Sequence, residues 1–150
     1  MAKAVILLDE LDMTLKSKDI LRHLGSEDRS IKDQVLAGKL SQQVGRLDFA
    51  IQIAKQTSYQ NKNLLELNYP IIETPKVVSK RAVLPQEVIL SLIRQESEFD
   101  RDANSWVGAK GLMQIMPATG RLVSKQAGLK YSRSRLIEDE FFNLQLGCYY

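Results

Sequence analysis

Two glutamates, Glu96 and Glu98, stand two positions apart at the end of an apolar run in the stretch ILSLIRQESEFD, residues 89–100. A carboxyl group in a cleft can donate a proton to a leaving group and later accept one, which is general acid–base catalysis. The simpler alternative is that both glutamates form the polar end of a surface helix. The geometry of the helix that carries them separates their roles.

The spacing predicts a helix through PQEVILSLIRQES, with Pro85 in the first turn, where proline is favoured. Its apolar stripe consists of Val88, Ile89, Leu92 and Ile93. Glu96 follows Leu92 by four positions and Ile93 by three, so it lies on the same face as the stripe. Glu98 is two positions further on, about 200° round the helix, and is expected to point at solvent.

Glu96 is therefore the unusual residue of the pair. Burial would remove its hydration, and the partial negative charge of a helix C-terminus would also disfavour its anion. Both effects favour the protonated form, which can deliver a proton at neutral pH. The competing interpretation is that Glu96 pairs with Arg94 or another cation, since structural ion pairs outnumber active sites. This stretch alone does not decide between them.

The segment that follows, SEFDRDANSWVGAKGLMQIMPATG, predicts a loop and then a helix that Pro117 opens and Gly128 closes. The loop glycines allow sharp turns and close approach of backbone. Side chains suited to a cleft that holds amides and hydroxyls cluster around this loop, namely Ser105, Met113 and Gln114. Each also has a structural interpretation, as a loop serine, a core methionine and a capping glutamine. Spacing alone leaves both open.

The first seventy residues predict helical hairpins. One helix is expected to begin at a capping Ser17 and end at Gly25, and the next to begin at a capping Ser26 and end at Gly45. A further helix is expected to start near Leu47. The two helix-ending glycines stand twenty residues apart, a spacing that hints at stacked helix pairs of a solenoid.

Two prolines, Pro70 and Pro75, interrupt the helical pattern and favour extended backbone before them. They place a boundary between two helical parts. The predicted organisation is a helical-hairpin segment at 1–68, a linker at 69–84 and a second helical domain at 85–150.

Composition excludes several function classes. Residues 1–84 hold 13 Lys and Arg against 10 Asp and Glu, and residues 85–150 hold 8 against 8, an excess too small and scattered to predict nucleic-acid binding. The densest basic stretch, KVVSKR at 76–81, is interpreted as solvated linker. The single Cys148 excludes an internal disulfide, and with the single His23 it offers no metal site. No cofactor is expected, and His23 is interpreted as a helix-surface residue.

The N-terminal stretch MAKAVILLDELD lacks the long apolar core of a secretory signal, so no signal peptide is expected. No apolar run is long enough to predict a membrane span.

The glutamate–serine pair at 96–97 and the run SWVGAKGLMQIMPAT at 105–119 closely resemble the catalytic domain of soluble lytic transglycosylases, lysozyme-like enzymes that cleave bacterial peptidoglycan. The later stretch DEFFNLQLGCYY resembles a family helix at three positions, Asn143, Gly147 and Tyr150. Upstream, GRLDFAIQIAKQTS and NYP resemble the end of the helical superhelix of the large family members.

The chain departs from the family pattern in three places. Arg101 and Glu140 each stand where the family often has proline. The later alanine-tyrosine-asparagine-alanine-glycine motif, which builds the other wall of the family's cleft, does not occur before Tyr150. A C-terminally truncated domain is therefore expected, with poor or no activity by itself, because small cores cannot spare the helices that cover them.

The resemblance implies an all-α fold in which a helical-hairpin, superhelical segment precedes the N-terminal part of a lysozyme-like α domain. It implies cleavage of the β-1,4 bond between N-acetylmuramic acid and N-acetylglucosamine, with formation of 1,6-anhydromuramic acid. Glu96 would act first as acid and then as base, while Ser105, Met113 and Gln114 would contact substrate. The implied partner is the peptidoglycan glycan strand, without metal, cofactor or nucleic acid, in the periplasm or cell envelope.

Two alternatives stay open. The same fold could carry a hydrolytic muramidase. Glycosidases usually use two carboxylates, and besides Glu98 the nearest candidates for a second one are Asp100 and Asp102, although nothing in their spacing favours them. The chain could also be an inactive helical fragment or interaction module.

Overall fold

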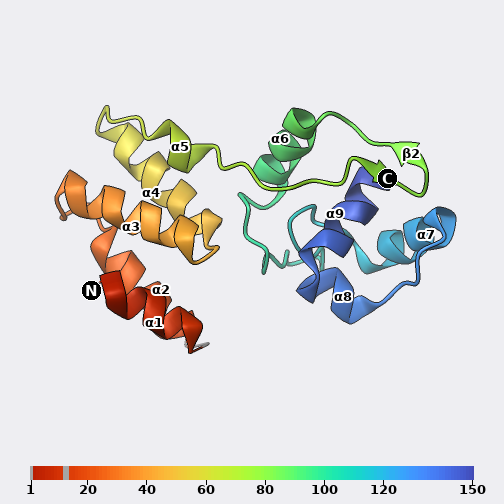
Figure 1. Cartoon of the computed structure of the whole chain (residues 1–150), viewed down its shortest axis with the longest axis horizontal. Coiled ribbons are helices and arrows are strands. Elements are labelled where there is room, and N and C mark those ends of the chain that lie inside the picture. Colours follow the sequence, from red (N-terminus) through yellow and green to blue (C-terminus); the bar gives the residue numbers. More distant parts are fainter. Residues whose placement is uncertain (1, 12–13) are drawn as a thin grey trace. The chain divides into compact units, whose positions relative to one another are not determined.

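A computed structural model of the chain describes residues 2–11 and 14–150. These residues form two compact units, unit 1 up to Pro70 and unit 2 from Ile71 onward (Figure 1). Both units are helical, and the sheet within the described residues is one ribbon of two short strands, which confirms the predicted all-α class. None of the helices in the described part of the chain is long and apolar enough to cross a bilayer.

Unit 1 is a series of helices that pack against their neighbours along the chain. They are α1 (Ala2–Glu10), α2 (Thr14–Leu24), α3 (Ile31–Gln43), α4 (Leu47–Tyr59) and α5 (Leu65–Asn68). Buried aliphatic side chains from the first four of these helices form its main core: Val5, Leu21, Leu24, Ala37, Leu40, Val44 and Ile53. A second small core joins α4 to α5. The predicted helical-hairpin arrangement is thus confirmed.

Some helix boundaries in unit 1 agree with those predicted from the sequence and some do not. The backbone of Gly45 is left-handed, with φ 69°, and α4 begins at Leu47, as predicted. The predicted cap at Ser26 is wrong: α3 is capped by Ser30, whose Oγ accepts a hydrogen bond from the Asp33 amide at 3.2 Å. The Ser26 hydroxyl instead contacts the carbonyl of His23, so it closes the preceding turn.

One further expectation for unit 1 is corrected and one agrees with the structure. The second helix begins at Thr14, one turn before the predicted Ser17, which lies buried inside the helix. Because serine can cap a helix or sit within one, its type did not fix the start. His23 is exposed on the surface of α2, as interpreted.

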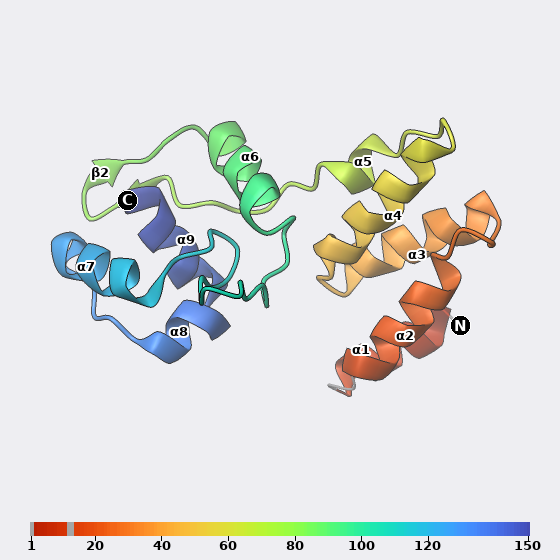
Figure 2. The same cartoon turned by 180° about the vertical axis from the view of Figure 1, so that it is seen from behind.

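Unit 2 contains the two strands β1 (Val77–Val78) and β2 (Arg81–Ala82) and four helices. The helices are α6 (Gln86–Glu96), α7 (Pro117–Ala127), α8 (Arg133–Glu138) and α9 (Glu140–Tyr149). In both views α9 lies between α6 and α8 (Figures 1 and 2). The core of this unit comprises Ile115, Val123, Leu136, Phe142 and Leu146. Pro117 opens α7 and Gly128 closes it with φ 66°, as predicted, while Pro85 precedes α6 at the N-cap.

The stretch 69–84 carries the β1–β2 hairpin. Its two turn residues, Ser79 and Lys80, both have positive φ (50° and 66°), which is typical of a type I′ turn. Val78 is buried, and the Ser79 hydroxyl donates a hydrogen bond to the carbonyl of Ala127 at the end of α7. The hairpin is thereby attached to the helical part of unit 2.

Asp139 caps α9, and its removal should cost stability in a pH-dependent way. The Phe142 amide donates to Asp139 Oδ1 at 2.9 Å, and this bond, with the guanidinium of Arg135 at Oδ2, holds the pKa of Asp139 below its usual value. Asp139→Ala should therefore lower the free energy of unfolding by about 1 kcal/mol at pH 7. Since the folded pKa is depressed, this difference should shrink as pH falls below about 4. Urea unfolding at several pH values measures it; a difference that is constant down to pH 2 would contradict this origin.

Candidate functional site

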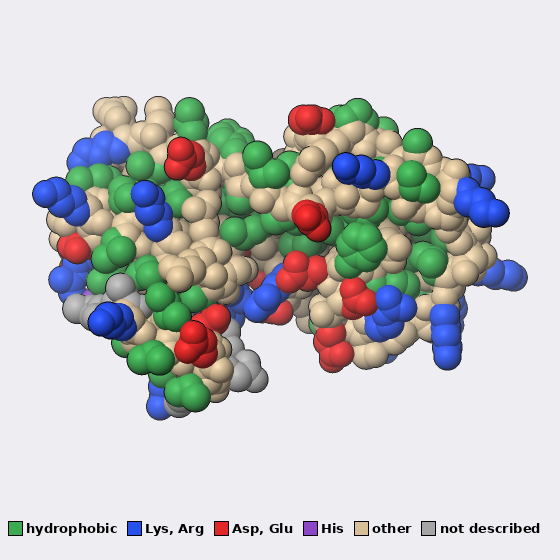
Figure 3. Space-filling view, in the orientation of Figure 1, with side chains coloured by type: hydrophobic (Ala, Val, Ile, Leu, Met, Phe, Trp, Pro, Cys, Tyr) green, Lys and Arg blue, Asp and Glu red, His purple; other side chains and the backbone are tan. Residues whose placement is uncertain are grey.

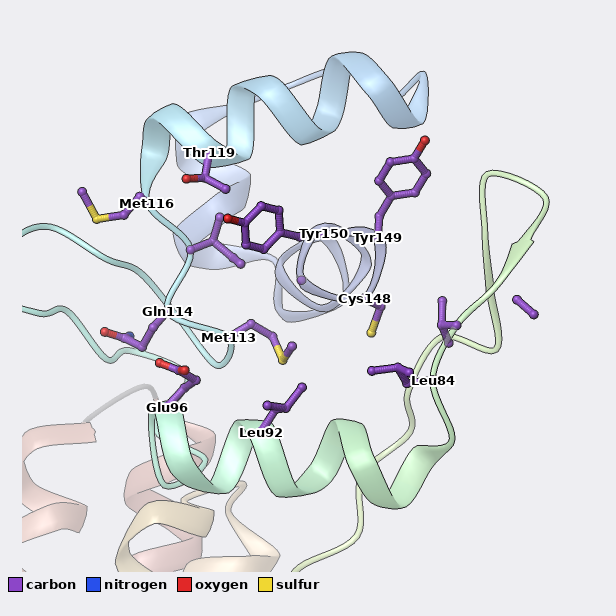
Figure 4. Close-up of a pocket in the computed structure, with 14 residues that line it drawn as sticks. Leu84, Leu92, Glu96, Met113, Gln114, Met116, Thr119, Cys148, Tyr149 and Tyr150 are labelled. Atoms are coloured by element: carbon purple, nitrogen blue, oxygen red, sulfur yellow. The ribbon is translucent and has the colours of Figure 1, made fainter.

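The main cavity of unit 2 has a volume of about 770 Å³. Its walls come from α6, from the loop that precedes α7, from the end of α9 and from residues 82–84 (Figure 4). Its lining is mostly apolar with a few polar groups, among them Glu96, Gln114 and Thr119. Size and lining are those of a pocket for a small molecule or a polymer segment.

Glu96 ends α6 on the pocket side. The apolar stripe of this helix is divided: Ile89 and Ile93 are 1% and 0% exposed, whereas Val88 and Leu92 are 42% and 41% exposed. Glu96 extends the exposed side of this stripe, and it lies beside Leu92 on the cavity wall (Figure 4). The prediction that Glu96 is buried is therefore wrong, because its side chain is exposed. Helical spacing shows which residues share a face, but not which edge of that face a neighbouring element covers.

The competing interpretation, a pair between Glu96 and Arg94, is also wrong. Arg94 Nη1 lies 3.2 Å from Glu98 Oε1, and Glu98 lies outside the pocket lining. The backbone turns sharply after α6, since Glu98 and Phe99 both have positive φ (51° and 64°), and the buried Phe99 anchors the turn. Within residues 2–11 and 14–150, no hydrogen bond or ion pair engages the Glu96 carboxylate.

Glu96 is the sole side-chain carboxylate on this cavity wall among the described residues. Asp100 and Asp102, the candidates for a second acid, lie outside the lining, and Asp100 Oδ1 accepts a hydrogen bond from the Asp102 amide at 3.0 Å. Within the described residues, Glu96 is thus the one side-chain carboxylate that this pocket offers to a bound ligand.

Met113 and Gln114 both line the pocket, facing Glu96 and Leu92 (Figure 4). The backbone of Gln114 is left-handed, with φ 45°. Its Nε2 donates to the carbonyls of Gly111 at 2.9 Å and Ala103 at 3.3 Å. The side-chain nitrogen thus braces the loop, which leaves the amide oxygen as the group that can accept a hydrogen bond from a ligand hydroxyl or amide.

Ser105 is the one predicted site residue outside the pocket lining. Its Oγ accepts a hydrogen bond from the Ala109 amide at 2.9 Å, and its own amide donates to the Ala109 carbonyl at 3.0 Å. Ser105 therefore shapes the loop, and its contact with substrate stays a prediction. The adjacent Trp106 is 97% exposed and is the single tryptophan of the chain, so its fluorescence can report whether a ligand reaches this loop.

Asn143 is the residue that positions the pocket loop, a role that the sequence did not predict. It is 2% exposed; its Nδ2 donates to the carbonyls of Lys110 at 2.9 Å and Leu136 at 3.0 Å, and its Oδ1 accepts from the Met113 amide at 2.9 Å. A Cβ at Gly111 would lie 2.6 Å from this Nδ2, so only glycine fits. An asparagine within the apolar run EFFNLQL was the available signal, because buried amides need partners.

Comparison with known protein families decides the classification. The family model described as "Transglycosylase SLT domain" matches residues 74–150. The chain belongs to this family. The predicted resemblance to soluble lytic transglycosylases is thus confirmed.

Two kinds of relative support the family and the fold. The soluble lytic murein transglycosylase of Escherichia coli K12 is 37% identical over 68 residues, which are 45% of this chain and 10% of that protein. An inactive variant of the lytic transglycosylase Slt from Pseudomonas aeruginosa superposes with a TM-score of 0.71 at 25% identity, over 97% of this chain and 24% of that one. The 70-kDa soluble lytic transglycosylase of E. coli gives a TM-score of 0.73 at 25% identity, over 99% of this chain and 24% of that one.

This chain thus spans about a quarter of the length of these two solved family members. Its helical hairpins and its second helical unit both have counterparts in them, because the superpositions cover nearly all of its residues.

Cys148 lies on the same cavity wall, and its thiol should react slowly. Burial raises the pKa of this thiol to about 11. Because the thiolate is the nucleophile, alkylation at pH 8 should be about 100-fold slower than for a free cysteine, whose pKa is about 8.5. The rate should continue to rise with pH beyond 9. Mass spectrometry of the iodoacetamide-treated chain, with the urea-unfolded chain as control, measures it; a rate that levels off near pH 8.5 in the folded chain would contradict the prediction.

Proposed function

We propose that this chain provides the acid–base centre of a lytic transglycosylase, which cleaves the β-1,4 bond between N-acetylmuramic acid and N-acetylglucosamine in peptidoglycan. One observation carries the proposal. In a chain of this family, the single side-chain carboxylate on the cavity between α6 and α9, Glu96, has no partner among the described residues and stands beside Gln114.

In the proposed reaction Glu96 acts twice. Its protonated carboxyl donates to the glycosidic oxygen as that oxygen leaves C1, and the N-acetyl group of the sugar stabilises the cationic carbon. The resulting carboxylate takes the proton from the 6-hydroxyl, whose oxygen bonds to C1 and closes the 1,6-anhydro ring. The proton returns to Glu96 and no water is consumed, so one carboxylate suffices, as in substrate-assisted glycosidases.

The exposure of Glu96 in the free protein fits this role if the glycan completes its environment. A sugar chain lying against Leu92 and Met113 would exclude water from the carboxyl group. In that drier setting the neutral acid is favoured over the anion. Gln114 Oε1 would accept a hydrogen bond from the bound glycan, and Met113 would supply an apolar contact.

The inactive Pseudomonas relative supports the choice of a glutamate, because it carries glutamine in place of one glutamate. With peptidoglycan as the proposed partner, we expect the activity in the periplasm or cell envelope.

Product analysis tests the proposal. Purified peptidoglycan should be incubated with the chain in a molar amount comparable to that of the glycan strand ends. The masses of the soluble fragments are then measured by mass spectrometry. Muropeptides ending in 1,6-anhydromuramic acid, one water lighter than hydrolysed ones, are expected. Reducing-end muramic acid would support the hydrolytic muramidase instead. Because a truncated domain is expected to have poor or no activity by itself, the same digestion is repeated with a longer chain that contains this segment, and no soluble product from that chain would support a non-catalytic helical module.

A further inference from the structure

Positive side chains gather on one side of unit 2, beside the pocket. Residues 74–86 and 103–137 together contain nine Lys and Arg and no Asp or Glu, so the charges of this unit are segregated along the chain. In the space-filling view the blue side chains collect at the edge formed by α7 and the hairpin, while the red ones lie on the other side of this unit (Figure 3). Five exposed cations, which we call the basic face, are Lys80, Arg81, Arg121, Lys125 and Lys130.

The basic face is one surface because the hairpin turn is attached to the end of α7. The Ser79 hydroxyl donates to the Ala127 carbonyl, which places Lys80 beside the last turn of α7. Arg121 and Lys125 are four residues apart on the exposed side of that helix, and Lys130 follows it. Cations from two separate segments thus converge.

The same elements join the basic face to the pocket. The guanidinium of Arg81 lies over the ring of Tyr149, 5.0 Å from its centre, and the Tyr149 hydroxyl donates to the Gln126 carbonyl at 3.0 Å. Both Tyr149 and Ala82, which follows Arg81, line the pocket. A polymer that leaves the pocket along this wall would meet the basic face next.

These cations are not neutralised within the protein. In the part of the chain that the structure describes, none of the five forms an ion pair with a carboxylate. An ordinary solvated surface intersperses charges of both signs, whereas a single-sign surface attracts a partner of opposite charge.

We propose that the basic face is a second attachment surface for peptidoglycan, outside the pocket, which binds the carboxylates of its stem peptides. The identity of the polymer rests on the proposed function. Each exposed contact is weak and screened by salt, but several contacts to one polymer act together. The face would keep the protein on the cell wall between cleavage events.

Retention on purified insoluble peptidoglycan tests this without requiring turnover. The test variant combines Lys80→Glu, Lys125→Glu and Lys130→Glu; the control combines Lys16→Glu, Lys32→Glu and Lys62→Glu, three exposed lysines of unit 1 with the same change in charge. At low salt the test variant should bind about tenfold more weakly than the unmodified chain, and the control within about twofold of it. About 1 M salt should abolish the difference. Circular dichroism verifies that both variants fold.

A second arm uses glycan strands from which an amidase has removed the stem peptides, and in which the lactyl carboxylates exposed by this cleavage have been converted to methyl amides. The unmodified chain and the test variant should bind these strands equally. Equal retention of the two proteins on intact peptidoglycan would overturn the proposal. Stronger retention of the unmodified chain on phosphatidylglycerol vesicles than on intact peptidoglycan would also overturn it. If Glu96 proved not to be catalytic but the salt-sensitive difference persisted, the proposed function would fail and the basic face would stand.

Discussion

Replacement of Glu96 by glutamine is expected to lower the rate of peptidoglycan cleavage by about 10²–10⁴-fold, the usual contribution of a general acid–base group. Glutamine keeps the size and hydrogen-bonding capacity of the side chain but cannot donate or take up the proton that both steps require. Because Glu96 is exposed and has no partner within the described residues, the substitution should leave the folded state intact. Release of anhydromuropeptides over time, followed by mass spectrometry, measures the rate.

Glu98→Gln is the matched control. It removes the same charge two residues away, but Glu98 lies outside the pocket and pairs with Arg94. Its cleavage rate should equal that of the unmodified chain. If the two variants lost activity to the same extent, the assignment of catalysis to Glu96 would be lost, because a general effect of charge or of the turn after α6 would explain both.

Asn143→Ala is expected to lower the free energy of unfolding of unit 2 by about 3 kcal/mol, since it leaves buried backbone groups without partners. The groups concerned are the Met113 amide and the carbonyls of Lys110 and Leu136. Denaturant unfolding measures the change. Amide exchange at Met113 should accelerate at the same time, because its acceptor is gone.

The control for this substitution is Asn104→Ala. Asn104 is exposed, and its Oδ1 accepts one hydrogen bond from Lys110 Nζ at 2.6 Å. Its loss should change stability by no more than about 0.5 kcal/mol. A similar small effect at Asn143 would mean that α9 does not hold the pocket loop in place.

The elements that the sequence predicted best are those marked by local chemistry. Proline and glycine restrict the backbone at their own positions, so the start of α7 at Pro117 and the left-handed residues Gly45 and Gly128 were predictable. Helix starts marked only by serine were less certain: both Ser26 and Ser30 can cap, and the choice depended on how the chain turns between α2 and α3.

The pocket was predictable only in part, because it is assembled from segments far apart in the chain. Helical spacing correctly placed Glu96 in line with Leu92, and the loop residues Met113 and Gln114 do line the same cavity. The burial of Glu96 was predicted wrongly, because the edge of α6 that carries it faces open space. The loop-bracing role of Asn143 depends on a bond across thirty residues, which no local pattern reports.

The most direct test of the central claim, that the pocket at the end of α6 holds the glycan against Glu96, is chemical-shift mapping by NMR. The Glu96→Gln variant, isotopically labelled, would be titrated with an oligosaccharide of alternating N-acetylmuramic acid and N-acetylglucosamine. The predicted result is that the largest shifts occur at Leu92, Met113 and the side-chain amide of Gln114. Shifts confined to the smaller groove of unit 1, which is lined by Val35, Lys39 and residues 63–67, would contradict it.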